Sequence, residues 1–421
     1  LGAVGNSSWG WHKSDLLKIY SAHCKTVINY GGYGWQGSLS NSKVEVLERV
    51  QNKCLRVVTG QYKSTPVEAL RCETGVQSIR TQIKRNALMA AEKAERLKHD
   101  HPSRLALQPS EDNAQPAVRH RTVRQSWRSF VAREKSNLKS IQTERRPINL
   151  FPFPPWTSAP NLTVRTKLHG IESKHDRKEK IVNAALTAIR EVDPSLTIYT
   201  DGSLSAGTTN GGSAAVFTIG DPANPTILDT ICRKGAVNTC SYEEELDAME
   251  IAAEEISEMT GSGHVMICSD SQSVCQALDD NNTDTSRVQY LISQYKGDVT
   301  IQWLPGHAGI PGNEAADQAA KDATQLQATP RATRYESACS AIAREVKDGP
   351  PAHERVREVY SCYSKAKEKY NSRHDQSNLA RIRAGHHLVF QAFQHRMDET
   401  VDPSCPECRP SHDGRTHLGG A

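Results

Sequence analysis

Four acidic residues that lie far apart in the sequence constrain this chain most. They are Asp201, Glu245, Asp270 and Asp317, and each is predicted at the end of a strand or inside a helix beside one. Carboxylates that meet at one point without a basic partner repel one another unless cations neutralise them. A fold that brings these four together therefore predicts a metal-dependent site for phosphoryl transfer.

Hydrophobic periodicity between residues 196 and 325 predicts a mixed α/β sheet. A stretch rich in Gly and Asn at 205–211 separates two strand-like runs, which is a hairpin signal. The predicted strands cover residues 196–199, 212–219, 226–234, 264–268 and 299–303. The predicted helices cover residues 242–259, 271–278, 286–295 and 313–325. Three antiparallel strands followed by alternating helices and strands predict a five-stranded mixed sheet with helices on its faces.

The residue types at these positions indicate the chemistry. Oxygen ligands without His or Cys favour Mg²⁺ or Mn²⁺ over zinc, and two such ions roughly 3.5 to 4 Å apart activate water and neutralise a scissile phosphate. His307 lies in a loop between Gly306 and Gly309, where a mobile imidazole suits proton transfer to a leaving group. Each residue alone more often has a structural role, as a helix cap, as part of an acidic helix N-terminus or as a solvated loop residue. Only the combination indicates catalysis.

Short motifs occur in a fixed order over about 130 residues of this region. They are Thr200-Asp-Gly-Ser203, Glu245-Leu-Asp-Ala248, Asp270-Ser-Gln272, Gly306-His307, and Gly312-Asn-Glu314 with Asp317. Together they resemble the type 1 ribonuclease H family. The resemblance implies a ribonuclease H-like fold in which Asp201, Glu245, Asp270 and Asp317 hold two Mg²⁺ ions, with Mn²⁺ as a substitute, and His307 assists catalysis. The implied reaction is endonucleolytic hydrolysis of the RNA strand of an RNA–DNA hybrid, which leaves a 3′-hydroxyl and a 5′-phosphate.

The resemblance also implies contacts to the nucleic acid and shows departures from the family pattern. The expected contact residues are Gly202, Ser203, Ser241, Gln272 and Asn313. Ser241 stands where many relatives place an Asn that reads the minor groove of the hybrid, and its hydroxyl is a shorter partner for a ribose 2′-hydroxyl. A Lys- and Trp-rich insertion between the helices that begin at 271 and 286 is missing, so we expect binding to depend on neighbouring regions.

The position of the catalytic Glu needs a choice of register. Glu243 and Glu244 directly precede Glu245, and a slip by one residue is conceivable. Leu246 and Ala248 fit the family pattern only if Glu245 is the catalytic residue.

The flanking regions resemble parts of a retroelement. Residues 1–105 read as helices, and the segments 30–35, 47–56 and 65–70 resemble the thumb region of non-LTR (jockey/I-like) retrotransposon reverse transcriptases. The polymerase fingers and palm are missing, so no polymerase activity is expected. Because the chain starts at Leu1 instead of Met, we expect a C-terminal fragment of a polyprotein whose polymerase domains lie elsewhere.

The remaining segments complete the predicted organisation. Residues 106–177 contain many prolines and read as a linker, 178–326 as the ribonuclease H domain with a leading helix, and 327–421 as a helical tail. Cys405, Cys408 and His417 near the end have the spacing of zinc ligands. Three ligands do not close a structural Zn²⁺ site, so an incomplete end is favoured over zinc binding.

Composition limits the alternatives only weakly. The net charge of +4 permits a polyanionic partner without requiring one. Eleven cysteines without a secretory leader favour a reducing compartment, nucleus or cytoplasm, and no apolar run approaches the roughly 20 residues that span a bilayer. Two alternative functions remain open: a related two-metal nuclease that cuts DNA, and an inactive nucleic-acid-binding remnant of a retroelement.

Overall fold

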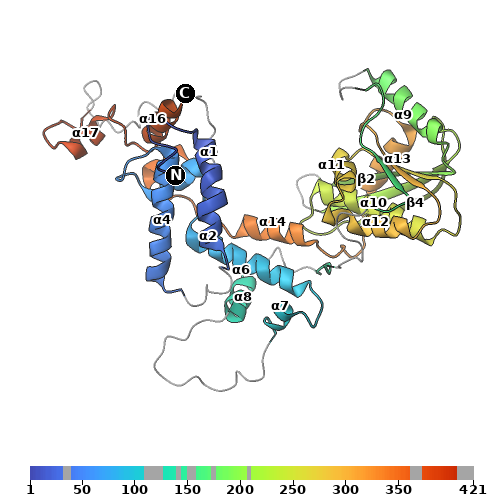
Figure 1. Cartoon of the computed structure of the whole chain (residues 1–421), viewed down its shortest axis with the longest axis horizontal. Coiled ribbons are helices and arrows are strands. Elements are labelled where there is room, and N and C mark those ends of the chain that lie inside the picture. The colour runs from blue at the N-terminus through green and yellow to red at the C-terminus, as the bar shows by residue number, and fades with distance from the viewer. Residues whose placement is uncertain are drawn as a thin grey trace. The chain divides into compact units, whose positions relative to one another are not determined.

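The chain forms two compact units, each described here by itself (Figure 1). The computed structural model describes residues 1–31, 39–108, 127–138, 144–148, 158–171, 177–205, 210–360 and 372–404. The first unit comprises Leu1–Glu95, Asp100–Lys139 and Ile342–Ala421, and the second comprises Arg96–His99 and Ser140–Ala341. Much of the segment predicted to be a linker lies outside the described residues, as do residues 32–35 of the first retroelement-like segment.

The first unit is helical. Its described helices are α1 (Lys13–Ile19), a π-helix (Tyr20–Lys25), α2 (Thr26–Asn29), α4 (Asn41–Thr59), α5 (Val67–Thr74), α6 (Ile79–Glu95), α7 (Pro102–Leu105), α8 (Trp127–Lys135), α15 (Glu354–Val359), α16 (Arg373–Arg383) and α17 (Gln391–Met397). Gly60 ends α4 with φ 70°, a left-handed conformation that favours glycine. Leu16, Tyr20, Leu55 and Leu70 are fully buried and form the core of α1, α4 and α5. Within the described residues, no helix of either unit is long and apolar enough to cross a membrane.

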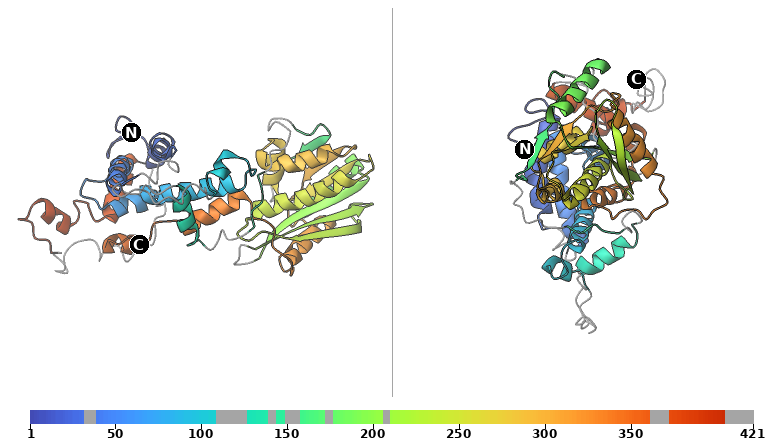
Figure 2. Two further views of the ribbon diagram at one scale, coloured as in Figure 1. Left: turned by 90° about the horizontal axis from the view of Figure 1, so that it is seen from below. Right: turned by 90° about the vertical axis from the view of Figure 1, so that its right-hand side faces the viewer.

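The second unit is built on a mixed sheet with helices on both faces, which confirms the predicted fold class (Figure 2). The strand order is β1-β6-β5-β2-β3-β4. The strands are β1 (Leu162–Arg165), β2 (Leu196–Leu204), β3 (Gly211–Ile219), β4 (Thr226–Lys234), β5 (Val265–Ser269) and β6 (Val299–Trp303). β1 pairs with β6, β6 with β5, and β5 with β2, all in parallel. β3 pairs antiparallel with both β2 and β4.

The predicted number of five strands is wrong, because the sheet has six. The additional strand, β1, comes from the segment predicted to be a linker and pairs in parallel with β6. Its four residues alternate between half-buried Leu162 and Val164 and exposed Thr163 and Arg165. An apolar–polar alternation that repeats only twice, in a segment with many prolines, is too short to indicate a strand from sequence.

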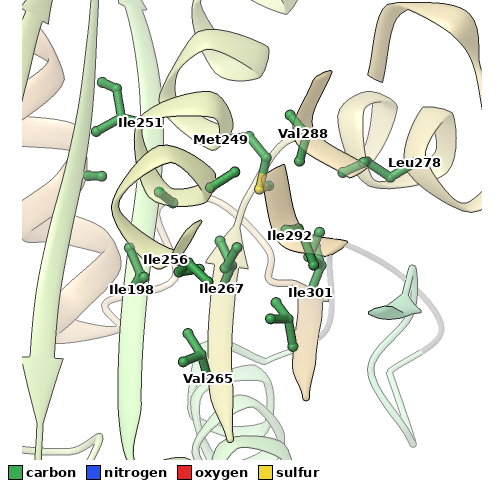
Figure 3. Close-up of a cluster of buried hydrophobic side chains, with 14 of the residues drawn as sticks. Ile198, Met249, Ile251, Ile256, Val265, Ile267, Leu278, Val288, Ile292 and Ile301 are labelled. Atoms are coloured by element: carbon green, nitrogen blue, oxygen red, sulfur yellow. The ribbon is translucent and has the colours of Figure 1, made fainter. Parts of the chain in front are cut away.

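Each face of the sheet has its own hydrophobic core. On one face, Ile198, Ile267 and Ile301 project from three neighbouring strands toward Met249 and Ile292 (Figure 3). The helices on this face are α10 (Ser241–Glu258), α11 (Gln272–Asp279) and α12 (Ser286–Ser293), which follows the short 3₁₀ turn Thr283–Thr285. On the other face, the intervening strand residues pack against α9 (Lys178–Val192) and α13 (Pro311–Ala323). The helix α14 (Tyr335–Glu345) follows the sheet domain.

Acidic side chains of α10 bind arginines from segments distant in sequence, and we call this set the α10 arginine network. Arg334 Nη2 lies 2.8 Å from Glu250 Oε1 and also contacts Asp247. Arg146 Nη2 lies 2.5 Å from Glu250 Oε2, and Arg146 Nη1 lies 3.2 Å from Asp247 Oδ1. The Asp247 and Glu250 side chains are only 3% exposed, so the guanidinium groups balance charges that are removed from water.

Removal of one arginine from this network is expected to destabilise the second unit. Arg334→Ala leaves two buried carboxylates with fewer partners and should lower the free energy of unfolding by about 3–5 kcal/mol. The matched control is Arg190→Ala, which breaks an ion pair with Asp221 whose side chains are 52% and 56% exposed, and should lower the free energy of unfolding far less. Hydrogen exchange of β2 and β5 amides in a urea series measures both. Equal losses in the two variants would contradict a structural role of the network.

Candidate active site

Three of the four predicted acids meet beside the sheet. Ligand oxygens of Asp201, Glu245 and Asp270 all lie within 4.8 Å of one another. Asp270 follows the end of β5, and Glu245 lies on α10. Asp201 lies inside β2, because the strand continues to Leu204 instead of ending at the acid as predicted.

Strand register and a glycine bring these acids together. Thr200 on β2 is the register partner of Ser269 on β5, so Asp201 and Asp270 follow side by side on parallel strands. Helix α10 then crosses β2 so closely that a Cβ on Gly202 would collide with the backbone N of Glu245. Gly202 therefore has to lack a side chain for Glu245 to reach the other two acids.

Burial and mutual repulsion dominate the electrostatics of the three acids. Burial, followed by the charges of Asp270 and Asp317, raises the pKa of Asp201 to about 7. Burial and the charges of Asp201 and Asp270 raise the pKa of Glu245 to about 10. The pKa of Asp270 is also raised, mainly by burial, although the charge of His307 opposes the shift.

The three acids fit a divalent metal ion. All of their donor atoms are oxygens, which Mg²⁺ and Mn²⁺ prefer. Glu245 Oε2 is buried and has no hydrogen-bond partner among the described residues. None of the three acids forms an ion pair within the described part of the chain, so a cation would relieve both the repulsion and the unpaired oxygen.

The fourth acid, Asp317, is oriented differently. Its Oδ2 lies 2.6 Å from Lys321 Nζ, one turn later on α13. Asp317 also belongs to a second group of ligand atoms within 4.8 Å, together with His307 and Glu314. Its charge still raises the pKa of Asp201, so it lies near the three acids without joining their group.

His307 is held in the loop after β6. It is exposed and has φ 54°, the left-handed region that residues other than glycine rarely adopt. A Cβ on the preceding Gly306 would approach Asp270 Oδ2 to 2.5 Å, so a glycine is needed for the loop to pass this close to the acid. The loop therefore presents the imidazole next to the three acids.

A groove of about 770 Å³ contains this site. Its walls include the predicted residues Ser241, Glu245, Asp270, Gln272 and His307. The other predicted contact residues do not line this groove. Gly202 and Ser203 lie in β2, with Gly202 against Glu245, and the buried Asn313 side chain on α13 hydrogen-bonds Asp270.

The structure adds residues that sequence reasoning missed. Lys178 on α9 and Tyr242 on α10 line the same groove, and no local motif marks either residue. The spacing of Lys321 four residues after Asp317 is a signal that was available in the sequence. The predicted zinc ligands Cys405, Cys408 and His417 lie outside the described residues.

Comparisons with known proteins agree with this geometry for one part of the chain. The model of the RNase H family matches residues 193–325, which contain all four acids and His307. No curated protein matches the chain. Among solved structures, the chain is similar to RNase H1 from the halophilic archaeon Halobacterium salinarum, with 21% identity over 31% of this chain and 97% of that chain and a TM-score of 0.26. Residues 193–325 therefore match the RNase H family, and this match supports a nuclease.

The raised pKa of Asp201 predicts how metal-free stability depends on pH. The folded protein keeps this proton to about pH 7, whereas an ordinary Asp loses it near 3.8, so stability is lost as pH rises between these values. Asp201→Asn cannot ionise and should be more stable than the wild type at pH 8 in EDTA, by on the order of 1–3 kcal/mol. At pH 4 the difference should largely disappear. Urea unfolding of both proteins across this range measures the effect.

The control for this experiment is Asp221→Asn. Asp221 is exposed, and its partner Arg190 holds its pKa below the usual value, so the substitution should bring no gain in stability at pH 8. A loss of stability in Asp201→Asn under metal-free conditions would contradict the repulsion assigned to the three acids.

Proposed function

We propose that this protein is a metal-dependent endonuclease that hydrolyses the RNA strand of RNA–DNA hybrids during retrotransposon reverse transcription. The observation that carries the proposal is the convergence of Asp201, Glu245 and Asp270 within an RNase H domain. The retroelement context is supported by the resemblance of the flanking regions to a thumb and a tail. Polymerase domains would be supplied by other parts of the parent protein.

The acids are proposed to hold two Mg²⁺ ions, for which Mn²⁺ can substitute. Asp201, Glu245 and Asp270 would be the shared ligands, and Asp317 would join them when its carboxylate leaves Lys321. When bound, such ions activate water and stabilise the leaving oxygen. The unpaired Oε2 of Glu245 and the raised pKa values of Asp201 and Glu245 support this role.

The other groove residues are proposed to orient the substrate and to move a proton. The Ser241 hydroxyl and the Gln272 amide can hydrogen-bond a ribose 2′-hydroxyl, the group that distinguishes RNA from DNA. The exposed imidazole of His307 can donate a proton from a ring nitrogen to the leaving 3′-oxygen.

Substitution of the acids should separate catalysis from folding. We expect Asp270→Asn or Asp201→Asn to lower cleavage of a labelled hybrid at least about 10²-fold, because each removes charge from the metal site. Asp279→Asn, an exposed acid at the end of α11, is the matched control and should cleave normally. Near-normal turnover by purified Asp270→Asn in Mg²⁺ would reject the assignment.

His307→Ala should slow turnover less than the acid substitutions do. General acid catalysis typically contributes 10²–10⁴-fold, and solvent water that reaches the exposed loop can replace part of it. Cleavage rates of the variant on hybrid and on duplex DNA measure this, and they also test the substrate class. Preference for duplex DNA by the wild type would favour the alternative two-metal DNA nuclease.

Metal binding has a readout that is independent of activity. Addition of Mg²⁺ should raise the melting temperature of the wild-type protein, and the rise should increase with the logarithm of the Mg²⁺ concentration above Kd, because a ligand that binds only the folded state stabilises it. Asp201→Asn should respond much less. An equal Mg²⁺ response in both proteins would place the binding of the ion elsewhere.

A further inference from the structure

A segment outside the matched RNase H domain completes its sheet. Residues 158–192 precede the match at 193–325, yet β1 pairs with β6 through Val164 and Ile301. Helix α9 buries Ile181, Ala185 and Ile189 in the core on the face that also contains Tyr199 and Ala308. We call the described residues 162–171 and 177–192, which include β1 and α9, the β1–α9 arm. Core packing fixes the described parts of the arm relative to the three acids.

Strand register brings one lysine of the arm to the carboxyl end of the parallel strands, where the acids lie. Arg165 on β1 is the partner of Gln302 on β6, and Gln302 is the partner of Cys268 on β5. Lys167 lies two residues after Arg165, and Asp270 lies two residues after Cys268. Two strand spacings separate them, which corresponds to about 10 Å across the sheet edge.

Helix α9 brings a second lysine into the groove itself. Lys178, the first residue of α9, lines the groove together with Glu245, Asp270 and His307. Ile181, one turn later, lines the same groove and is 3% exposed, so it anchors this end of the helix. The Lys178 and Lys167 side chains are exposed, and no carboxylate of the described residues forms an ion pair with either. Their charges are available to a ligand.

The arm concentrates positive charge where the rest of the site is acidic. Its described residues between 162 and 180 carry Arg165, Lys167, Arg177, Lys178 and Lys180 against the single acid Glu179. In contrast, the end of α11 carries Asp279, and the connection from α11 to α12 carries Asp280 and Asp284. A nucleic-acid backbone that enters the groove is repelled by the free acids, and counter-charge next to them lowers that cost.

We propose that the β1–α9 arm is a binding element for the phosphodiester backbone of the hybrid. Lys178 contacts a phosphate next to the cleaved one, and Lys167 contacts the backbone further along the sheet edge. The inference rests on the proposed function, because it assigns the arm to the substrate of that same site. The arm then supplies the basic contact that the connection between α11 and α12 lacks.

The test uses the full chain with Lys167→Ala and Lys178→Ala combined. We expect KM for hybrid cleavage to rise about fivefold or more, with most of the loss in KM instead of kcat. Fluorescence anisotropy of a labelled hybrid, measured in the Asp201→Asn background across a salt series, gives the second readout. The slope of log K against log salt should fall by about 1 to 2, since each phosphate contact contributes about 0.9 in B-form duplexes. Lys178→Arg should restore most of the affinity.

The control is Lys296→Ala, which removes an exposed lysine from the loop before β6. This loop lies at the amino end of β6, opposite to the end at which the acids lie. An unchanged salt slope in the double variant, equal to that of the control, would overturn the inference while hybrid cleavage by the wild type still supports the proposed function. Conversely, a wild-type protein that binds hybrid through these lysines but cleaves none would support the arm and reject the nuclease proposal.

Discussion

The parallel pairing of β2 with β5 is the constraint on which the site depends. It places Asp201 beside Asp270, and the close crossing of α10 over Gly202 adds Glu245. The three carboxylates repel one another and are largely buried, so their pKa values rise. Hydrophobic packing of Ile198 and Ile267 against α10 holds them in place against this repulsion. Such an arrangement is complementary to a cation before any cation arrives.

Helix α10 carries acids in two different environments. Asp247 and Glu250 are buried and bind the guanidinium groups of Arg146 and Arg334. Glu245, on the same helix, has one carboxylate oxygen without any partner among the described residues. Glu243 and Glu244 also have one such oxygen each, but of these three acids only Glu245 lines the groove. This contrast on one helix argues that the missing counter-charge at Glu245 belongs to function.

Local patterns predicted that three of the acids converge, but not the long-range contacts. The order of motifs suggested that Asp201, Glu245 and Asp270 meet, and Asp270 after a strand and Glu245 near a helix start lie where the periodicity predicts them, whereas Asp201 lies inside its strand. The four-residue strand β1 gave too short an alternation to recognise. The ion pairs of Arg146 and Arg334 with α10 join residues about a hundred positions apart, and no local signal marks such pairs. The pairing of Asp317 with Lys321 has helical spacing, but sequence alone does not say whether the acid faces the lysine or the metal site.

The folded unit is larger than the region that matches the RNase H family. Residues 193–325 alone would leave Asp247 and Glu250 buried without Arg146 and Arg334, and would leave the edge of β6 without β1. The backbone reinforces this extension, because the N–H of Arg146 donates to the carbonyl of Thr333 and the N–H of Thr333 donates to that of Glu144. An unpaired buried carboxylate costs several kcal/mol, comparable to the net stability of a small domain. The segments on either side of the match are therefore part of the same folded unit, and helix α10 depends on them for its position.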